Sequence, residues 1–259
     1  MKVIVCIKQV PNTNEVKLDQ KTGTLIREGV PSIINPDDKA GLEAALKLKD
    51  QFGARVTVLS MGPPQADAAL REALAMGVDE AVLISDRAFG GADTWATSST
   101  LAAAIRKLEY DIIITGRQAI DGDTAQVGPQ ISEHLGIPNI SYAEGIEVKD
   151  GHITVKRQYE DRYHMIRAKL PCLITALSEL GEPRYMTPSG IFDAWQREIP
   201  VWTRSDLTID DSSIGLNGSP TRVKRSFTKA VKGKGTVITL EPEESAGWLA
   251  DRLSEKFII

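Results

Sequence analysis

The amino-acid sequence predicts an α/β protein with an open, mainly parallel sheet and helices on both faces. Two observations predict this class. Short runs rich in Val and Ile alternate with longer amphipathic segments through the first half of the chain, and the apolar content of 42% over 259 residues is enough for one large core. Such alternation is typical of parallel strands joined by helical crossovers.

The expected strands and helices follow one another in regular order. The strands are residues 3–7, 56–60, 81–85 and 111–115. The helices between them are residues 35–53, 64–77 and 93–109. In the first helix, Asn35 is placed as N-cap, Pro36 occupies the first helical position, and Gly53 marks the end.

The second half of the chain has a different pattern. Two alternating runs flank Asp150 and Gly151, which predicts a β-hairpin with a tight turn. Residues 171–178 read as one more buried strand. A basic stretch at 219–235 and a short amphipathic helix at 241–257 then form a tail too small for its own core, so we expect this tail to bind a partner protein.

Composition excludes several classes of protein. A net charge of −4 argues against general nucleic-acid binding. The two cysteines, Cys6 and Cys172, lie in separate apolar runs and are expected to be reduced. The chain starts in an apolar strand without a leader or a membrane-spanning run, so we expect a cytoplasmic protein without membrane insertion. The three histidines lack metal-ligand spacing and no nucleophile–base motif is present, so we assign no metal and no catalytic residue.

The segment TGRQAIDGDTAQVGPQ, residues 115–130, is the most informative part of the sequence. It follows a strand, and ligands of open parallel sheets bind beyond the carboxyl ends of the strands. Asp123 and Gln126 have capping-box spacing, which predicts a helix from Thr124 with amide groups free to bind an anion. A helix that starts near Gly128 is the alternative, because it places Pro129 in the first turn. The segment also fits an ordinary polar turn.

Common nucleotide motifs are absent from the chain. No strand is followed by G-x-G-x-x-G, and there is no G-x-x-x-x-G-K-[ST]. A conventional dinucleotide fold and a phosphate-loop enzyme are therefore excluded as first interpretations.

Several motifs in order resemble the β subunit of electron-transfer flavoproteins of the electron-bifurcating type. They are GRQAIDGDTAQVGPQ, NPDDKAGLEAA, SMGPPQA, ALAMGVDEA and LPCLITA followed by EPRYM. The resemblance implies a fold similar to the adenine-nucleotide α-hydrolase group and a heterodimer with an α subunit. It implies a nucleotide-binding domain over residues 1–187, then a recognition segment and an arm over residues 188–259 that contacts the α subunit.

The resemblance also implies a set of nucleotide-binding residues. Carried over position by position, they are Cys6, Asn35, Pro36, Asp37, Asp38, Met61, Asp121, Gly122, Asp123, Thr124, Ala125, Gln126, Val127, Gly128, Pro129, Gln130, Ile131 and Ser132. The loop DGDTAQVGPQ resembles that of bifurcating members, which hold FAD here, whereas the loop of AMP-binding members is more acidic and lacks the proline. We therefore expect FAD, with AMP as the alternative.

The function implied by the resemblance is electron transfer with the protein as scaffold. FAD in this subunit would take electrons from NADH and divide them between ferredoxin or flavodoxin and an FAD of the α subunit, which serves an acyl-CoA dehydrogenase. NADH oxidation would need the heterodimer. The alternatives are a non-bifurcating carrier with structural AMP, a stand-alone regulatory module that resembles universal stress proteins, and an ATP-cleaving enzyme, although the Ser-Gly-Gly loop of such enzymes is missing.

Overall fold

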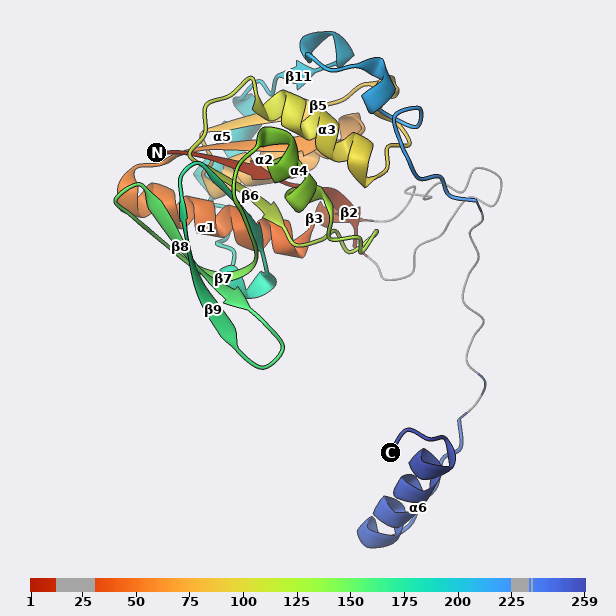
Figure 1. Cartoon of the computed structure of the whole chain (residues 1–259). Coiled ribbons are helices and arrows are strands. Elements are labelled where there is room, and N and C mark those ends of the chain that lie inside the picture. Colours follow the sequence, from red (N-terminus) through yellow and green to blue (C-terminus); the bar gives the residue numbers. More distant parts are fainter. Residues whose placement is uncertain (13–30, 225–232, 234) are drawn as a thin grey trace. The chain divides into compact units, whose positions relative to one another are not determined.

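The computed structural model describes residues 1–12, 31–224, 233 and 235–259 (Figure 1). The chain forms two compact units, Met1–Lys224 and Arg225–Ile259, and each is described by itself. No helix among the described residues has the length and apolar character needed to cross a membrane.

A sheet of nine strands forms the centre of the first unit, in the order β11-β5-β4-β1-β6-β10-β7-β8-β9. The strands from β11 to β7 are parallel, and the pairs β7–β8 and β8–β9 are antiparallel. The predicted class, an open and mainly parallel α/β sheet, is confirmed. The strand bounds are β1 Lys2–Cys6, β4 Arg55–Met61, β5 Glu80–Ile84, β6 Ile112–Gly116, β7 Asn139–Lys149, β8 His152–Gln158, β9 Tyr163–Lys169, β10 Cys172–Ala176 and β11 Val201–Trp202.

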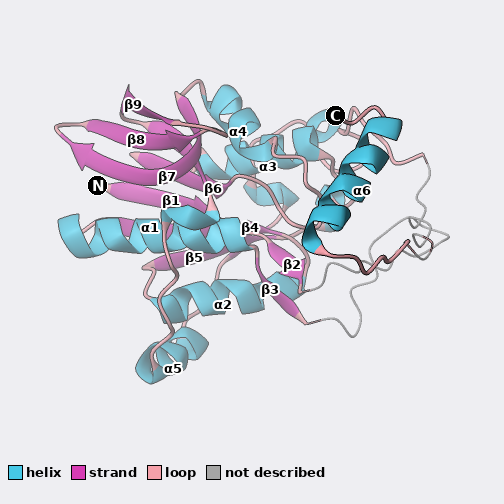
Figure 2. Ribbon diagram, turned by 90° about the horizontal axis from the view of Figure 1, so that it is seen from below, coloured by secondary structure: helices cyan, strands magenta, loops and turns pink. Residues whose placement is uncertain are grey.

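Helices cover both faces of this sheet, as the sequence predicts. On one face lie α1 (Pro36–Phe52) and α2 (Asp67–Met76), with α5 (Pro188–Gln196) packed on α2 (Figure 2). On the other face lie α3 (Thr94–Ile105) and α4 (Val127–Leu135) (Figure 1). The buried side chains accordingly form two clusters, one on each side of the sheet.

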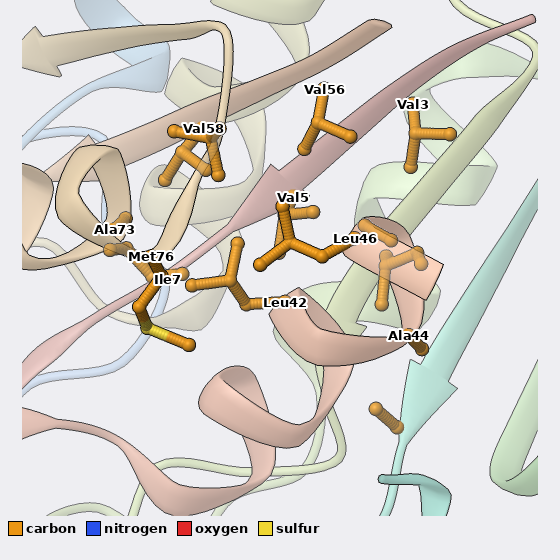
Figure 3. Packing of buried hydrophobic residues seen from close by; sticks show 14 of the residues in the cluster. Val3, Val5, Ile7, Leu42, Ala44, Leu46, Val56, Val58, Ala73 and Met76 are labelled. Atoms are coloured by element: carbon orange, nitrogen blue, oxygen red, sulfur yellow. The ribbon is translucent and has the colours of Figure 1, made fainter. Parts of the chain in front are cut away.

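Helix α1 packs directly on the central strands. Its Leu42 and Leu46 lie against Val5 and neighbouring valines of the sheet (Figure 3). At Gly41 a β-carbon would lie 2.8 Å from Cγ2 of Ile114, so only glycine allows this close contact between helix and strand. Short 3₁₀ turns complete the connections, at Pro64–Ala66, Arg87–Phe89, Ser178–Leu180, Arg204–Asp206 and Asp211–Ser213.

The order of the strands creates a switch point between β1 and β6. From β1 the chain continues to β4 and β5 on one side, then crosses to β6 and β10 on the other. Connections on the two sides therefore leave the sheet in opposite directions at the carboxyl ends of β1 and β6. Ligands of open α/β sheets bind at such a point.

The hairpin predicted at Asp150 and Gly151 is present between β7 and β8. Both residues have positive φ, 50° and 70°, as a tight primed turn requires. Several elements were not predicted. Strand β9 is largely exposed, and α5 buries only Ala194. The small pair β2 (Gln9–Pro11) and β3 (Ser32–Ile34) joins residues distant in sequence.

The second unit contains the predicted C-terminal helix as α6, Pro242–Glu255. None of its residues is buried within the described structure. The guanidinium of Arg252 lies 5.4 Å from the ring centre of Trp248, and the side chain of Leu249 is exposed. The apolar residues of this helix are thus free to contact another surface.

Candidate functional site

The predicted site residues come together at the carboxyl edge of the sheet. Strands β1, β4 and β6 end at Cys6, Met61 and Gly116. Helix α1 begins at this edge, and the segment from residue 117 to 126 leads from β6 to α4. This places the first turn of α1, the end of β4 and the predicted nucleotide loop around the switch point.

One carboxylate joins the two strands at the switch point. Oδ2 of Asp38 accepts a hydrogen bond of 2.7 Å from the Lys8 amide, just after β1, and Oδ1 accepts one of 2.9 Å from the Gly116 amide at the end of β6. A β-carbon on Gly116 would lie 2.2 Å from Oδ1 of Asp38. Glycine is therefore required at the end of β6, and Asp38 positions the strand ends with an already occupied carboxylate.

Burial governs the ionisation of the acidic and thiol groups here. It raises the pKa of Asp38 to about 7, although hydrogen bonds from the Lys8 and Gly116 amides oppose the shift. It also raises the pKa of Asp37, whose Oδ2 lies 3.3 Å from Nε of Arg117. Burial and the negative charge of Asp38 raise the pKa of Cys6 to about 12, so this side chain is a neutral thiol within the core.

Asn35 precedes α1 as predicted, but its side chain does not cap the helix. Its Nδ2 donates to the Gln118 carbonyl at 2.8 Å, and its Oδ1 accepts from the Ile120 amide at 3.1 Å. The Asn35 side chain therefore binds the backbone of Gln118 and Ile120 instead of capping α1. Asn35 fastens the loop after β6 to the start of α1.

The two aspartates of the loop have partners within the protein. Nζ of Lys8 lies 2.6 Å and 2.8 Å from the two carboxylate oxygens of Asp121, whose side chain is only 9% exposed. Oδ1 of Asp123 accepts a hydrogen bond of 2.9 Å from Nε2 of Gln118. Lys8 thus offsets the charge of Asp121 and brings a cation into the site. Sequence reasoning missed Lys8, although its position directly after β1 was a usable signal.

The predicted capping box at Asp123 is wrong. Helix α4 begins at Val127, with Gln126 in the N-cap position and no side-chain cap. Positive φ values at Asp123 (49°) and Ala125 (54°) are incompatible with a helix through these residues. The alternative start near Gly128 is therefore correct, and Pro129 falls in the first turn, where it is tolerated.

The same backbone leaves several amide groups of the loop without a partner. Residues 123 and 125 have positive φ, and Thr124 does not. Within the described structure, the amides of Thr124, Ala125, Gln126 and Val127 have no hydrogen-bond acceptor. Together with the start of α4, they form a concentration of free donors.

The later residues of the predicted site hold the helix rather than line a cleft. A β-carbon on Gly128 would lie 2.5 Å from Oγ1 of Thr115 and 2.8 Å from Cγ2 of Thr175, so this glycine lets α4 touch the sheet. Ile131 is fully buried, and Oγ of Ser132 donates to the Pro129 carbonyl. These contacts position α4 and its free amides.

Several polar groups near this edge are buried without a partner. Among the described residues they include Oγ of Ser60 in β4 and Oε1 of Gln130 in α4. These oxygens are enclosed by protein atoms, where an unsatisfied hydrogen-bonding group is costly. Helix α3 also reaches the site, since Oγ1 of Thr94 donates to Oε1 of Gln126 at 2.8 Å. This approach of α3 was not predicted from sequence. The described residues contain no group of three metal-ligating side chains.

Two hollows of the first unit lie away from this edge. One of about 400 Å³ is lined by residues of α2 and α5, including Met76 and Asp193, and by Arg184. Another of about 270 Å³ lies beside Trp95 and His134. Neither contains the free amides of the nucleotide loop or the switch-point residues. We therefore assign the site from its donors and topology rather than from the size of a hollow.

We predict that the two glycines of the loop respond differently to valine. Gly128→Val should lower the free energy of unfolding by about 1–3 kcal/mol, because its side chain would overlap Thr115 and Thr175. Gly122→Val is the matched control and should change it by no more than about 0.5 kcal/mol, since no atom lies within 4 Å of the added carbon. Chemical denaturation measures the free energy of unfolding of both variants. Equal losses would contradict the assignment of Gly128 to helix packing.

We also predict a pH-dependent contribution from Asp38. Its pKa in the folded state, about 7, exceeds the ordinary value of 3.8. The unfolded chain therefore releases this proton first, and stability falls as pH rises from about 4 to about 7, by at most about 1.4 kcal/mol per pH unit.

Asp38→Asn removes this titration, so the difference in unfolding free energy between wild type and variant should shrink from pH 5 to pH 7. The matched control is Asp210→Asn, because hydrogen bonds from Ser212 lower the pKa of that exposed carboxyl. The difference in unfolding free energy between Asp210→Asn and wild type should stay constant from pH 5 to pH 7. If the difference between Asp38→Asn and wild type also stayed constant, the raised pKa of Asp38 would be contradicted.

Comparison with known proteins agrees with this arrangement. Residues 22–207 match the family described as electron transfer flavoprotein domain. The electron transfer flavoprotein subunit beta of Clostridium acetobutylicum is 58% identical over 259 residues, which cover 100% of each chain. Subunit CarD of the caffeyl-CoA reductase-Etf complex of Acetobacterium woodii is 56% identical over 262 residues. The acryloyl-CoA reductase electron transfer subunit gamma of Anaerotignum propionicum is 47% identical over 267 residues. Both comparisons cover 100% of each chain. The chain belongs to the electron transfer flavoprotein family and groups with its β subunits.

Proposed function

We propose that this chain binds FAD at the carboxyl edge of its sheet and passes electrons from NADH by bifurcation as part of a heterodimer with an α subunit. The observation that carries the proposal is the row of free amides from Thr124 to Val127 at the start of α4, beside the cation of Lys8. Free amides at a helix N-terminus favour phosphate groups. A diphosphate fits these donors better than it would fit an acidic loop.

The residues of the site divide into two roles under this proposal. The amides of Thr124 to Val127 bind the phosphates. Asp38 and Asn35 hold the loop in position, and their side chains are already bonded to the protein.

Lys8 provides the positive charge of the site. Its Nζ is held by Asp121 while its side chain is 44% exposed, so the cation remains accessible at the edge of the sheet. Fixed donors and charges of this kind orient a cofactor and adjust its electronic properties. Bound FAD would supply the hydride and single-electron chemistry.

The electron partners follow from the same proposal. Two relatives carry the names of CoA-ester reductase assemblies, which supports an acyl-CoA dehydrogenase as one partner. Ferredoxin or flavodoxin is the other acceptor. We propose a cytoplasmic location, where the buried free thiols Cys6 and Cys172 stay reduced.

The segment after residue 187 provides surfaces for these partners. Helix α5 exposes Phe192 and Trp195 and is held by Arg71, which donates to the Ala194 carbonyl at 2.7 Å. The Arg71 guanidinium also lies 4.9 Å from the Trp195 ring. We propose that α5 contacts the dehydrogenase and that the arm with α6 holds the α subunit, because both expose large apolar side chains.

The cofactor proposal predicts two FAD molecules per heterodimer. Nucleotides extracted from fresh α/β complex are quantified, and the complex is mixed with NADH without oxygen while the flavin spectrum is recorded. Flavin reduction by NADH is expected. One FAD and one AMP without reduction by NADH would contradict bifurcation and identify an AMP-containing carrier.

A pair of lysine variants locates the nucleotide. Lys8→Gln should lower nucleotide content in the β subunit, because it removes the cation and leaves Asp121 uncompensated. Lys39→Gln is the control, since Lys39 pairs with Glu72 between α1 and α2. Full nucleotide content in both variants would mean that the ligand lies elsewhere.

The partner proposal predicts that α6 contributes to α-subunit affinity. Replacement of Trp248, Leu249 and Leu253 by Ala should weaken binding strongly, because each buried apolar side chain contributes about 1.5–3 kcal/mol. Replacement of the exposed Glu243 and Glu244 by Gln is the control. Titration calorimetry with the purified α subunit measures both, and equal affinities would contradict the role of α6.

A further inference from the structure

The last described segment of the first unit is fastened to the start of α3. The chain from Ile214 to Thr221 packs on the turn before this helix, where the Leu216 amide donates to the Gly90 carbonyl at 3.0 Å. Gly215 has a φ of 54°, and a β-carbon there would lie 2.1 Å from the Ala88 carbonyl oxygen. The path of this segment is thus closely defined by its contacts.

Asp93 makes the final and most extensive of these attachments. Its amide donates to Oγ of Ser219 at 2.8 Å, and its Oδ2 accepts from the Thr221 amide at 3.0 Å and the Thr221 hydroxyl at 2.7 Å. Ser219 is buried, and its hydroxyl donates to the Gly215 carbonyl. Thr221 stands three residues before Lys224, the last residue of the first unit. The bonds to Asp93 therefore fix the point from which the arm continues.

Asp93 has a second task through its other oxygen. Oδ1 accepts the Ala96 amide at 3.0 Å and caps α3. Although burial raises the pKa of Asp93, hydrogen bonds from Ala96 and Thr221 lower it below the ordinary value, so the carboxylate is charged at neutral pH. The next residue, Thr94, donates to Gln126 of the nucleotide loop. Asp93, which binds the segment before the arm, is thus the sequence neighbour of Thr94, which contacts the nucleotide loop.

We propose that Asp93 is a positioning residue for partner binding, which fixes the base of the C-terminal arm at the nucleotide edge so that the arm reaches the α subunit from a defined point. This inference rests on the proposed role of the arm. A tethered segment binds more tightly when its starting point is fixed, because less conformational freedom is lost on association. Asp93 therefore contributes to affinity for the α subunit without contact to it.

Two substitutions separate this role from helix capping. Asp93→Asn retains a good N-cap, because Asn caps as well as Asp, but its amide nitrogen cannot accept from Thr221. Thr221→Val removes the hydroxyl donor and leaves α3 untouched. Asp210→Asn is the matched control, since Asp210 caps a 3₁₀ turn of the same unit and contacts Ser212 rather than the arm.

The experiment measures affinity of full-length chains for the purified α subunit by titration calorimetry. Asp93→Asn and Thr221→Val should each weaken binding about tenfold, the equivalent of one hydrogen bond to a charged group. The double variant should lose no more than Asp93→Asn alone, and Asp210→Asn should bind as wild type. Hydrogen exchange should show faster exchange of the Thr221 amide in Asp93→Asn.

A second set of variants, with the apolar residues of α6 replaced, tests whether the effect of Asp93→Asn on affinity depends on the arm. In chains that carry Ala at positions 248, 249 and 253, Asp93→Asn should no longer reduce affinity. The same tenfold loss in both backgrounds would overturn the inference alone, because the effect would then not involve the arm. If the triple replacement itself left affinity unchanged, the proposed role of the arm would fail, and the inference with it.

Discussion

The buried carboxylate of Asp38 is the interaction on which the site depends. It binds the amides that follow β1 and end β6, two neighbouring strands at the switch point of the sheet. Removal of a carboxylate from water is costly, and two amide donors offset only part of that cost, as its raised pKa indicates. Burial of Asp38 thus lowers the stability of the fold, but its hydrogen bonds align the two strand ends and the loops that follow them.

Both carboxylates of the loop after β6 have partners within the protein. Asp121 is paired with Lys8, and Asp123 is bonded to Gln118, so neither carboxylate is left to repel a phosphate without compensation. The free amides before α4 remain as donors. The local field of the loop therefore depends on Lys8 and on the backbone donors as well as on the two carboxylates.

Helices α5 and α6 are built on a different principle from the sheet. The sheet buries its apolar residues in two clusters, whereas α5 and α6 keep large apolar side chains exposed. The first unit is stable through its own core, and these helices gain burial only on association. Such a division suits an electron-transfer subunit, in which a rigid cofactor scaffold must also dock on other proteins.

The sequence by itself determined the parallel sheet, the first helix, the hairpin at Asp150 and the family. These depend on local periodicity, on cap and turn residues, and on ordered motifs, all of which are legible along the chain. Only the tertiary structure decided what the polar residues of the site do. Asn35 has the residue type of a cap, yet it bonds to the loop after β6, and Asp121 finds Lys8 113 residues away in the chain. Local spacing at Asp123 predicted a cap, but positive φ values within the loop moved the start of α4 to Val127. Long-range hydrogen bonds and ion pairs override local preferences because they form only after the sheet brings its strand ends together.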